Sequence, residues 1–181
     1  LELAEKYRAQ IARATGLDNV AFKYGRIQDL RTDIPAIEAW LAANPVSSYA
    51  DMEALETFKK QQAHEAPLIP DASMDVIVSN CVLNLVAAGD KAALFSEMFR
   101  VLKVGGRAVI SDIVSDEETP LHMRNDPELW SGCVSGAFQE REFLRAFENA
   151  GFYGISIAKR DTAPWRTVEG IEFRSVTITA Y

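Results

Sequence analysis

The sequence has few of the features that mark disulfide-rich, membrane or nucleic-acid-binding proteins. Only 2 of its 181 residues are cysteine, which is too few for a disulfide framework. No apolar run approaches the ~20 residues that span a bilayer. The formal net charge is −7, whereas nucleic acids and anionic membranes favour a basic protein surface. We therefore expect a protein that binds neither nucleic acid nor membrane.

The N-terminus lacks the pattern of a signal peptide. Apolar residues recur at helical spacing among charges over residues 1–16, which predicts an amphipathic helix that ends at Gly16. We therefore expect a cytoplasmic protein. Hydrophobic residues make up 48% of the chain and charged residues 25%, as in ordinary globular domains. The length fits a single domain with a full core.

Further along the chain, helical and strand periodicities alternate. Helices are predicted at 34–43, 49–64, 90–103 and 139–150, and strands at 19–24, 75–80, 107–111, 153–157 and 171–180. This order predicts an α/β fold with a Rossmann-like, mostly parallel sheet and a terminal antiparallel strand. The last strand changes its alternation phase, which predicts a bulge. The first strands of such a fold are absent, and the edge that this exposes would favour a homodimer.

The most informative stretch is DVIVSNCVLNL, residues 75–85. Its β-branched start predicts a parallel strand covered on both faces. Cys81 follows where that strand leaves the sheet, and ligands of open α/β sheets bind at this carboxyl edge. Cys133 lies in a later loop that could fold over the same edge. The alternative is that both cysteines are small buried hydrophobes.

Several motifs resemble those of arsenite methyltransferases, a family of class I S-adenosylmethionine-dependent methyltransferases. The specific ones are SNCVLNL at 79–85 and GCVSGA at 132–137, because LKVGGR at 102–107 is shared by many methyltransferases. RNDPELW at 124–130 and RTVEGIEF at 166–173 also fit. The resemblance covers nearly the whole chain except a helical insertion at about 31–70. It implies a class I methyltransferase fold.

The resemblance also implies a cofactor, a substrate and a site. The cofactor would be S-adenosylmethionine, and the small-molecule substrate would be arsenite. Cys81 and Cys133 would be the catalytic thiolates that bind arsenic(III), which is soft and prefers sulfur ligands. Bound arsenic keeps a lone pair that can attack the methyl group, so the reaction needs positioning more than acid–base chemistry. The cofactor-binding residues that remain are implied to be Ile27, Gln28, Ser79 and Asn80.

The sequence also departs from this family. It has no glycine-rich loop after a first strand and no upstream cysteine, Gln28 stands where Glu is usual, and Val104 stands where Pro is usual. We therefore expect a fragment, a single partial methyltransferase domain over residues 1–181. His64 and His122 are interpreted as surface residues and Trp130 as a packing residue.

Two other functions stay open at this point. One is a methyltransferase for an organic small molecule, in which the cysteines are incidental. The other is a non-catalytic arsenite-binding or scaffold protein. Asp112, at the end of its predicted strand, is either a polar site residue or a cap for the next segment.

Overall fold

The computed structural model describes residues 2–181, and the chain divides into two compact units, residues 1–69 and 70–181. The first unit is helical, with α1 (Glu2–Thr15), α2 (Ile34–Ala43) and α3 (Tyr49–Glu65). These helices confirm the three predicted for this part of the chain. No helix within residues 2–181 is both long and apolar enough to cross a membrane.

Helix α3 begins at a capping box. The Ser48 hydroxyl accepts the backbone N–H of Asp51, and the Asp51 carboxylate accepts the backbone N–H of Ser48 in return. The backbone and hydroxyl of Ser47 bind the same carboxylate, and these bonds lower the pKa of Asp51 to about 2. Helices α2 and α3 contact each other through stacking of Trp40 on Phe58, whose ring centroids lie 5.4 Å apart.

The strand predicted at residues 19–24 is wrong. This segment has no regular structure, and Val20 and Phe22 are exposed. A strand needs neighbouring backbone to complete its hydrogen bonds, and within residues 2–181 the nearest pairing is an isolated bridge between Arg26 and Asp29. The alternation of apolar residues therefore did not lead to a strand here.

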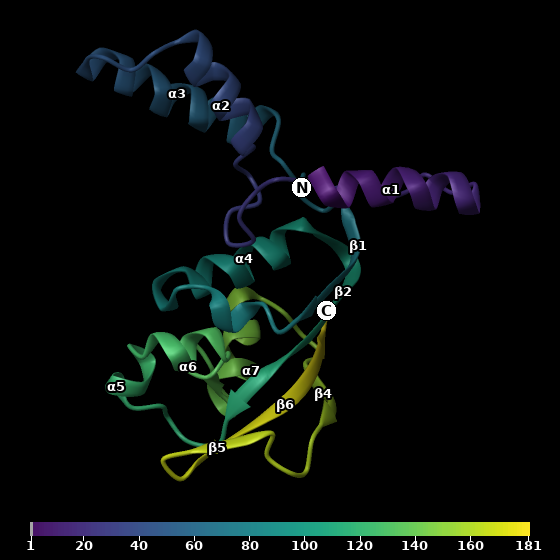
Figure 1. Cartoon of the computed structure of the whole chain (residues 1–181), viewed down its shortest axis with the longest axis vertical. Helices are drawn as coiled ribbons and strands as arrows, with labels where there is room; N and C mark the ends of the chain where they lie inside the picture. Colours follow the sequence, from purple (N-terminus) through teal and green to yellow (C-terminus); the bar gives the residue numbers. More distant parts are fainter. Residues whose placement is uncertain (1) are drawn as a thin grey trace. The chain divides into compact units, whose positions relative to one another are not determined.

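The second unit is built on a six-stranded mixed sheet (Figure 1). Its strands are β1 (Met74–Asn80), β2 (Leu102–Ser115), β3 (Phe138–Gln139), β4 (Ser156–Arg160), β5 (Arg166–Val168) and β6 (Ile171–Ala180). The order is β1-β2-β6-β4, with β3 beside β2 and β5 beside β6. Strands β1 and β3 are parallel to β2, whereas β6 is antiparallel to β2, β4 and β5. The predicted α/β sheet is confirmed, with a larger antiparallel part than one terminal strand.

Two helices cover one face of this sheet. The helical elements of the second unit are the 3-10 turns Leu83–Leu85 and Ala88–Asp90, and the helices α4 (Lys91–Val101), α5 (Leu121–Arg124), α6 (Pro127–Ser131) and α7 (Glu140–Ala150). Phe95 of α4 packs edge-on against Phe147 of α7, with centroids 4.9 Å apart. Both rings belong to the main core with Ile110 and Ile178 of the sheet.

The predicted bulge in β6 is wrong, and the phase change has another cause. Val176 and Ile178 lie in the main core under α4 and α7, whereas Phe173 belongs to a second core cluster on the other face. The pairing of β6 with β2 has no register shift. The apolar residues of β6 change their alternation phase because the buried face of the strand changes from one side of the sheet to the other along its length. A register shift does occur in β4, between Ile157 and Lys159.

Strand β1 is covered on one face only and lies at the edge of the described sheet, which corrects the prediction of a central strand covered on both faces. Ile77 packs on the main core, whereas Val76 and Val78 are 44% and 74% exposed. The reason is that α4 and α7 lie on the same side of the sheet, so the other face near β1 has no helix over it in residues 70–181.

The glycine pair 105–106, which precedes the strand predicted at 107–111, lies inside the longer strand β2. The pairing of β1 with β2 jumps from Met74–Leu102 to Val76–Arg107, so the glycines occupy a wide bulge. A Cβ atom at Gly106 would lie 2.9 Å from the carbonyl oxygen of Lys103. The bulge therefore needs glycine at this position.

Candidate functional site

Cys81 occupies a sharp bend directly after β1. Its φ of 54° is in the left-handed region, which turns the chain out of the strand direction. Its backbone N–H donates to the carbonyl of Ser111 at 2.9 Å, and its Sγ lies 3.5 Å from Oδ1 of Asn80. The residue is exposed. Its thiol therefore faces solvent at the carboxyl end of two parallel strands.

Cys133 also has a left-handed backbone conformation, with φ 58°. It follows α6, and its backbone N–H donates to the Trp130 carbonyl at 3.0 Å. Burial raises the pKa of the Cys133 thiol, and the charges of Asp112 and Cys81 raise that pKa further. Asn84, three residues after Cys81, donates a hydrogen bond to the carbonyl of Cys133, so the segments that carry the two cysteines meet at the same edge of the sheet. We call Cys81 and Cys133 the thiol pair.

A buried asparagine connects the two cysteine-bearing segments. Asn84 is 1% exposed, and its Nδ2 donates to the carbonyls of Ile113 at 2.7 Å and of Cys133 at 3.2 Å. The backbone N–H groups of Leu83 and Asn84 donate to the Asp112 carboxylate at 2.9 and 3.4 Å. The segment after Cys81 is thus fixed to β2 and to the loop that carries Cys133.

Asp112 is both a cap and a source of charge beside the thiol pair. Burial raises the pKa of its carboxyl, while the backbone N–H groups of Ile113, Leu83 and Asn84, and the charge of Lys91, act in the opposite direction. The thiol of Cys81 has a raised pKa, first through partial burial of its sulfur and then through Asp112. Both thiols are therefore protonated at neutral pH.

The four predicted cofactor residues fall into two pairs. Ser79 and Asn80 are the last residues of β1 and pair with Ile110 and Ser111 of β2. Successive strand residues point to opposite faces, so Ser79 faces the main core and exposed Asn80 faces the open side. Ile27 and Gln28 lie in the first unit, in the turn closed by the 26–29 bridge. The two pairs therefore belong to different units of the chain.

The histidines take no part in this site. His64 is exposed on α3, and His122 pairs with Glu169 on the surface, with Nε2 2.8 Å from the carboxylate oxygen. Both positions match the surface interpretation. Within residues 2–181 no group of three or more His, Cys, Asp or Glu side chains is arranged to hold a metal ion.

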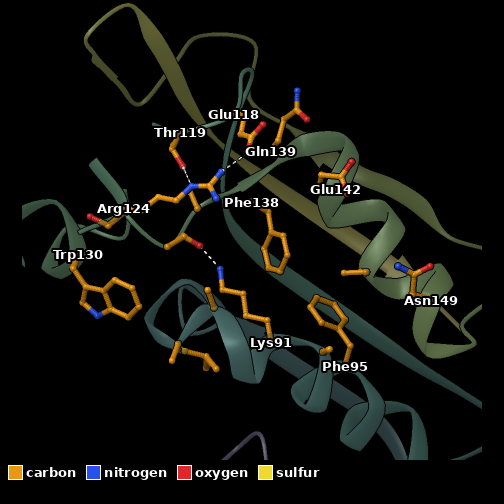
Figure 2. Close-up of a pocket in the computed structure, with 18 of the residues that line it drawn as sticks. Lys91, Phe95, Glu118, Thr119, Arg124, Trp130, Phe138, Gln139, Glu142 and Asn149 are labelled. Carbon is orange, nitrogen blue, oxygen red and sulfur yellow. Dashed lines mark hydrogen bonds and ion pairs between the residues drawn. The ribbon is translucent and has the colours of Figure 1, made fainter. Parts of the chain in front are cut away.

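A cavity of about 950 Å³ lies beside the thiol pair but does not include it (Figure 2). Lys91, Phe95, Arg124, Trp130 and Phe138 are among its lining residues. Trp130, interpreted from the sequence as a packing residue, is half-buried and forms part of this wall. Neither Lys91 nor Asn84 is among the site residues predicted from the sequence. A signal for Asn84 was present, because it is the one polar residue within the apolar run 82–86.

The Rossmann-like sheet, with polar residues and a cysteine at its carboxyl edge, defines a class of protein that binds a small molecule at that edge. A family model described as "Methyltransferase domain" matches residues 50–151. This match covers more than half of the chain, and the chain therefore belongs to the methyltransferase domain family.

Two relatives with similar sequences have a more specific name than the family, because both are arsenite methyltransferases. Arsenite methyltransferase of Halobacterium salinarum is 39% identical over 93 residues, which cover 51% of this chain and 23% of that protein. Arsenite methyltransferase of Aquipseudomonas alcaligenes is 30% identical over 152 residues, covering 84% and 34%. The chain thus spans about a quarter to a third of the length of these relatives.

A solved structure supports the fold. The structure of an arsenic(III) S-adenosylmethionine methyltransferase from Chlamydomonas reinhardtii aligns with a TM-score of 0.56 and 24% identity. The alignment covers 80% of this chain and 59% of that one. It shows that the two chains share the class I methyltransferase fold.

Proposed function

We propose that the chain is part of an S-adenosylmethionine-dependent methyltransferase whose substrate is arsenite held by Cys81 and Cys133. The observation that carries the proposal is the hydrogen bond from Asn84, three residues after Cys81, to the carbonyl of Cys133, which holds the two cysteine-bearing segments together although they are far apart in the sequence. The named relatives, which are arsenite methyltransferases, support the choice of substrate.

The protonation state of the thiol pair suits arsenite. At neutral pH arsenite is the neutral acid As(OH)₃, and each thiol that binds it replaces one hydroxide. The S–H proton leaves with that hydroxide as water, so two As–S bonds form with release of two waters and no net proton. The raised pKa of each thiol therefore does not oppose binding. Soft arsenic favours sulfur over the oxygen ligands that surround the site.

The open face beside Asn80 fits part of the cofactor. Asn80 and Ser111 lie opposite each other on this face, at the carboxyl ends of parallel strands where ligands bind. We propose that Asn80 contacts S-adenosylmethionine on this face, while the contacts implied for Ser79, Ile27 and Gln28 stay predictions. When bound, this cofactor supplies an electrophilic methyl group for the arsenic lone pair.

The role of the protein residues is then to hold arsenic in place. Two thiolate bonds remove the translational freedom of the substrate, and a fixed orientation supplies much of the rate of such a transfer. The Asn84 and Asp112 hydrogen bonds fix the backbone just after Cys81 and the carbonyl of Cys133. The partial single-domain organisation of residues 1–181 and the homodimer stay predictions.

The test is a calorimetric titration of arsenite into the reduced chain, beside Cys81→Ser and Cys133→Ser. We expect one arsenite per chain and a loss of about 10²-fold or more in affinity in either variant, because a second ligand on the same scaffold multiplies affinity by about 10²–10⁴. Ser131→Ala, a surface change near Cys133, is the matched control. Equal affinity in the wild type and both cysteine variants would reject the thiol site.

Methyl transfer separates the two alternatives, and it is measured with the full-length gene product. Methylation of an organic acceptor that survives the double Cys81→Ser, Cys133→Ser change would favour an organic substrate. Thiol-dependent arsenite binding without methyl transfer would favour a binding or scaffold protein. Methyl transfer to arsenite that is lost in the double variant is the expected result.

A further inference from the structure

The cavity shown in Figure 2 has the size and composition of a small-molecule site. Its volume of about 950 Å³ lies in the range of roughly 300–1,000 Å³ typical of ligand pockets. Its walls come from α4, from the segment around Arg124, from Trp130 and from one side of α7 along its length. Neither cysteine lines it, so the thiol pair does not account for this cavity.

A lysine without a carboxylate partner lies in the wall of this cavity. The Nζ of Lys91 donates to the carbonyl of Gly136 and lies 4.1 Å from the centroid of the Phe138 ring. Within residues 2–181 it makes no other hydrogen bond or ion pair that would use its two remaining N–H groups. Asp112 attracts it from a distance but uses its oxygens on the backbone N–H groups of 83, 84 and 113.

The other charged groups of the cavity do not neutralise this lysine. Arg124 donates to the Thr119 hydroxyl and to Glu118, at 3.1 and 2.8 Å. Glu142 accepts a hydrogen bond from Arg145 at 2.6 Å. Both carboxylates that line the cavity are therefore bound to arginines, while Arg124 repels the Lys91 ammonium. Among the described residues that line the cavity, the positive charge of Lys91 is therefore the one that no ion pair neutralises.

Aromatic side chains supply the apolar part of the wall. Figure 2 shows Phe138 above the Lys91 side chain, Phe95 beside it, and Trp130 across the cavity from Glu142 and Asn149 of α7. Such rings offer flat contact surfaces to a planar ligand. The cavity thus combines one unpaired cation with aromatic walls.

We propose that this cavity binds a small organic anion with a flat apolar body, whose carboxylate accepts the two free N–H groups of Lys91 and whose body packs against Trp130 and Phe138. This ligand site is separate from the thiol pair and does not depend on the arsenite proposal. The chemistry needed is a charge-assisted hydrogen bond at one end and aromatic contact at the other.

The protonation of Lys91 gives the site a pH dependence. Burial, and to a lesser extent Arg124, lower the pKa of Lys91 to about 8, while Asp112 raises it. The ammonium is needed to bind an anion, so binding is strong below pH 8 and weakens as the pH rises above that value.

The probe is 4-fluorobenzoate, followed by ¹⁹F NMR during titration with the reduced 181-residue chain. We expect saturable binding at pH 7, and weaker binding at pH 9.5. The neutral isostere 4-fluorobenzamide is expected to bind about ten-fold more weakly or worse, because it lacks the charge that strengthens the bond to Lys91. This comparison uses the wild-type chain and does not depend on any variant folding.

Variants then locate the site. Lys91→Met is expected to lose about ten-fold or more in affinity, and Lys91→Arg to retain binding. The control Lys103→Met removes an exposed lysine of β2 and is expected to bind like the wild type. The double Cys81→Ser, Cys133→Ser variant is also expected to bind normally. The proposal is overturned by absence of saturable binding, by equal binding of the benzamide, or by undiminished binding in Lys91→Met.

Discussion

The change Asn84→Asp tests whether the buried asparagine holds the two cysteine-bearing segments together. It keeps the shape of the side chain and replaces the Nδ2 donor by an oxygen. In the wild type Nδ2 donates to the carbonyls of Ile113 and Cys133. In the variant a carboxylate would face these two carbonyls and lie near the Asp112 carboxylate, which binds the backbone N–H of residue 84.

The size of the effect can be worked from these contacts. Each buried hydrogen bond contributes about 1 kcal/mol net, and a buried group left unpaired costs about 1–3 kcal/mol. Two lost bonds and two carbonyls facing a buried acid give about 3–5 kcal/mol of lost stability for Asn84→Asp. Asn84→Leu loses the same two bonds without adding a charge. Because Oδ1 of Asn84 has no partner within residues 2–181, its removal costs nothing, and we expect about 2 kcal/mol.

The assay is urea unfolding followed by circular dichroism, with Asn19→Asp as an exposed control expected to change stability by less than about 0.5 kcal/mol. Arsenite affinity is measured in parallel under conditions where each variant is folded, and we expect it to fall in both Asn84 variants. If Asn84→Asp were as stable as the wild type, or if Asn84→Leu were the less stable of the two, the bridging role of Nδ2 would be refuted.

Three further predictions concern the same region. Gly136→Ala would place a Cβ atom 1.8 Å from the Asn84 carbonyl oxygen, so we expect a loss of several kcal/mol in the free energy of unfolding. The control Gly89→Ala, with no atom within 4 Å of its Cβ, should be tolerated. An equal effect of the two substitutions on stability would contradict the close packing at Gly136. Asp112→Asn removes the charge that raises the pKa of both thiols, so the thiol pair should begin to react with a disulfide reagent at lower pH. An unchanged dependence of the reaction rate on pH would rule out an effect of Asp112 on the thiols. The pKa of Lys91 is about 8 in the folded chain against the ordinary value of 10.5, so between these pH values the unfolded chain binds more protons than the folded chain. The free energy of unfolding should therefore rise with pH across this window by up to about 3 kcal/mol. In urea unfolding at a series of pH values, Lys91→Met should lose this rise.

Local signals decided which elements the sequence predicts well. Helix α3 begins at Tyr49, as predicted, with Ser48 as its cap, and strand β6 has the predicted bounds, because a cap and a β-branched run are local features. The bulge at residues 105–106 requires the partner strand β1, and the absence of a strand at 19–24 reflects the lack of a pairing partner. Neither follows from local pattern.

The same distinction applies to the site. The position of Cys81 directly after β1 could be predicted because the end of a parallel strand is visible in the sequence, whereas its role as a ligand stays a prediction. Asn84 and Lys91 could not be assigned a role, since their bonds reach carbonyls 49 and 45 positions away. Such contacts arise only when the loop that carries Cys133 folds against the start of α4.

That loop, residues 132–137, is the element that the thiol pair and the cavity share. Asn84 holds the carbonyl of Cys133 from one side, and Lys91 holds the carbonyl of Gly136 from the other. Only two residues lie between Cys133 and Gly136, and Gly136 packs so closely on the Asn84 backbone that no Cβ fits. A ligand that changes the hydrogen bonding of Lys91 therefore acts on the same short segment that positions Cys133. We expect 4-fluorobenzoate to change the arsenite affinity of the wild type and to leave that of Lys91→Met unchanged. Such a coupling would be reciprocal, so arsenite would change the affinity for 4-fluorobenzoate by the same factor.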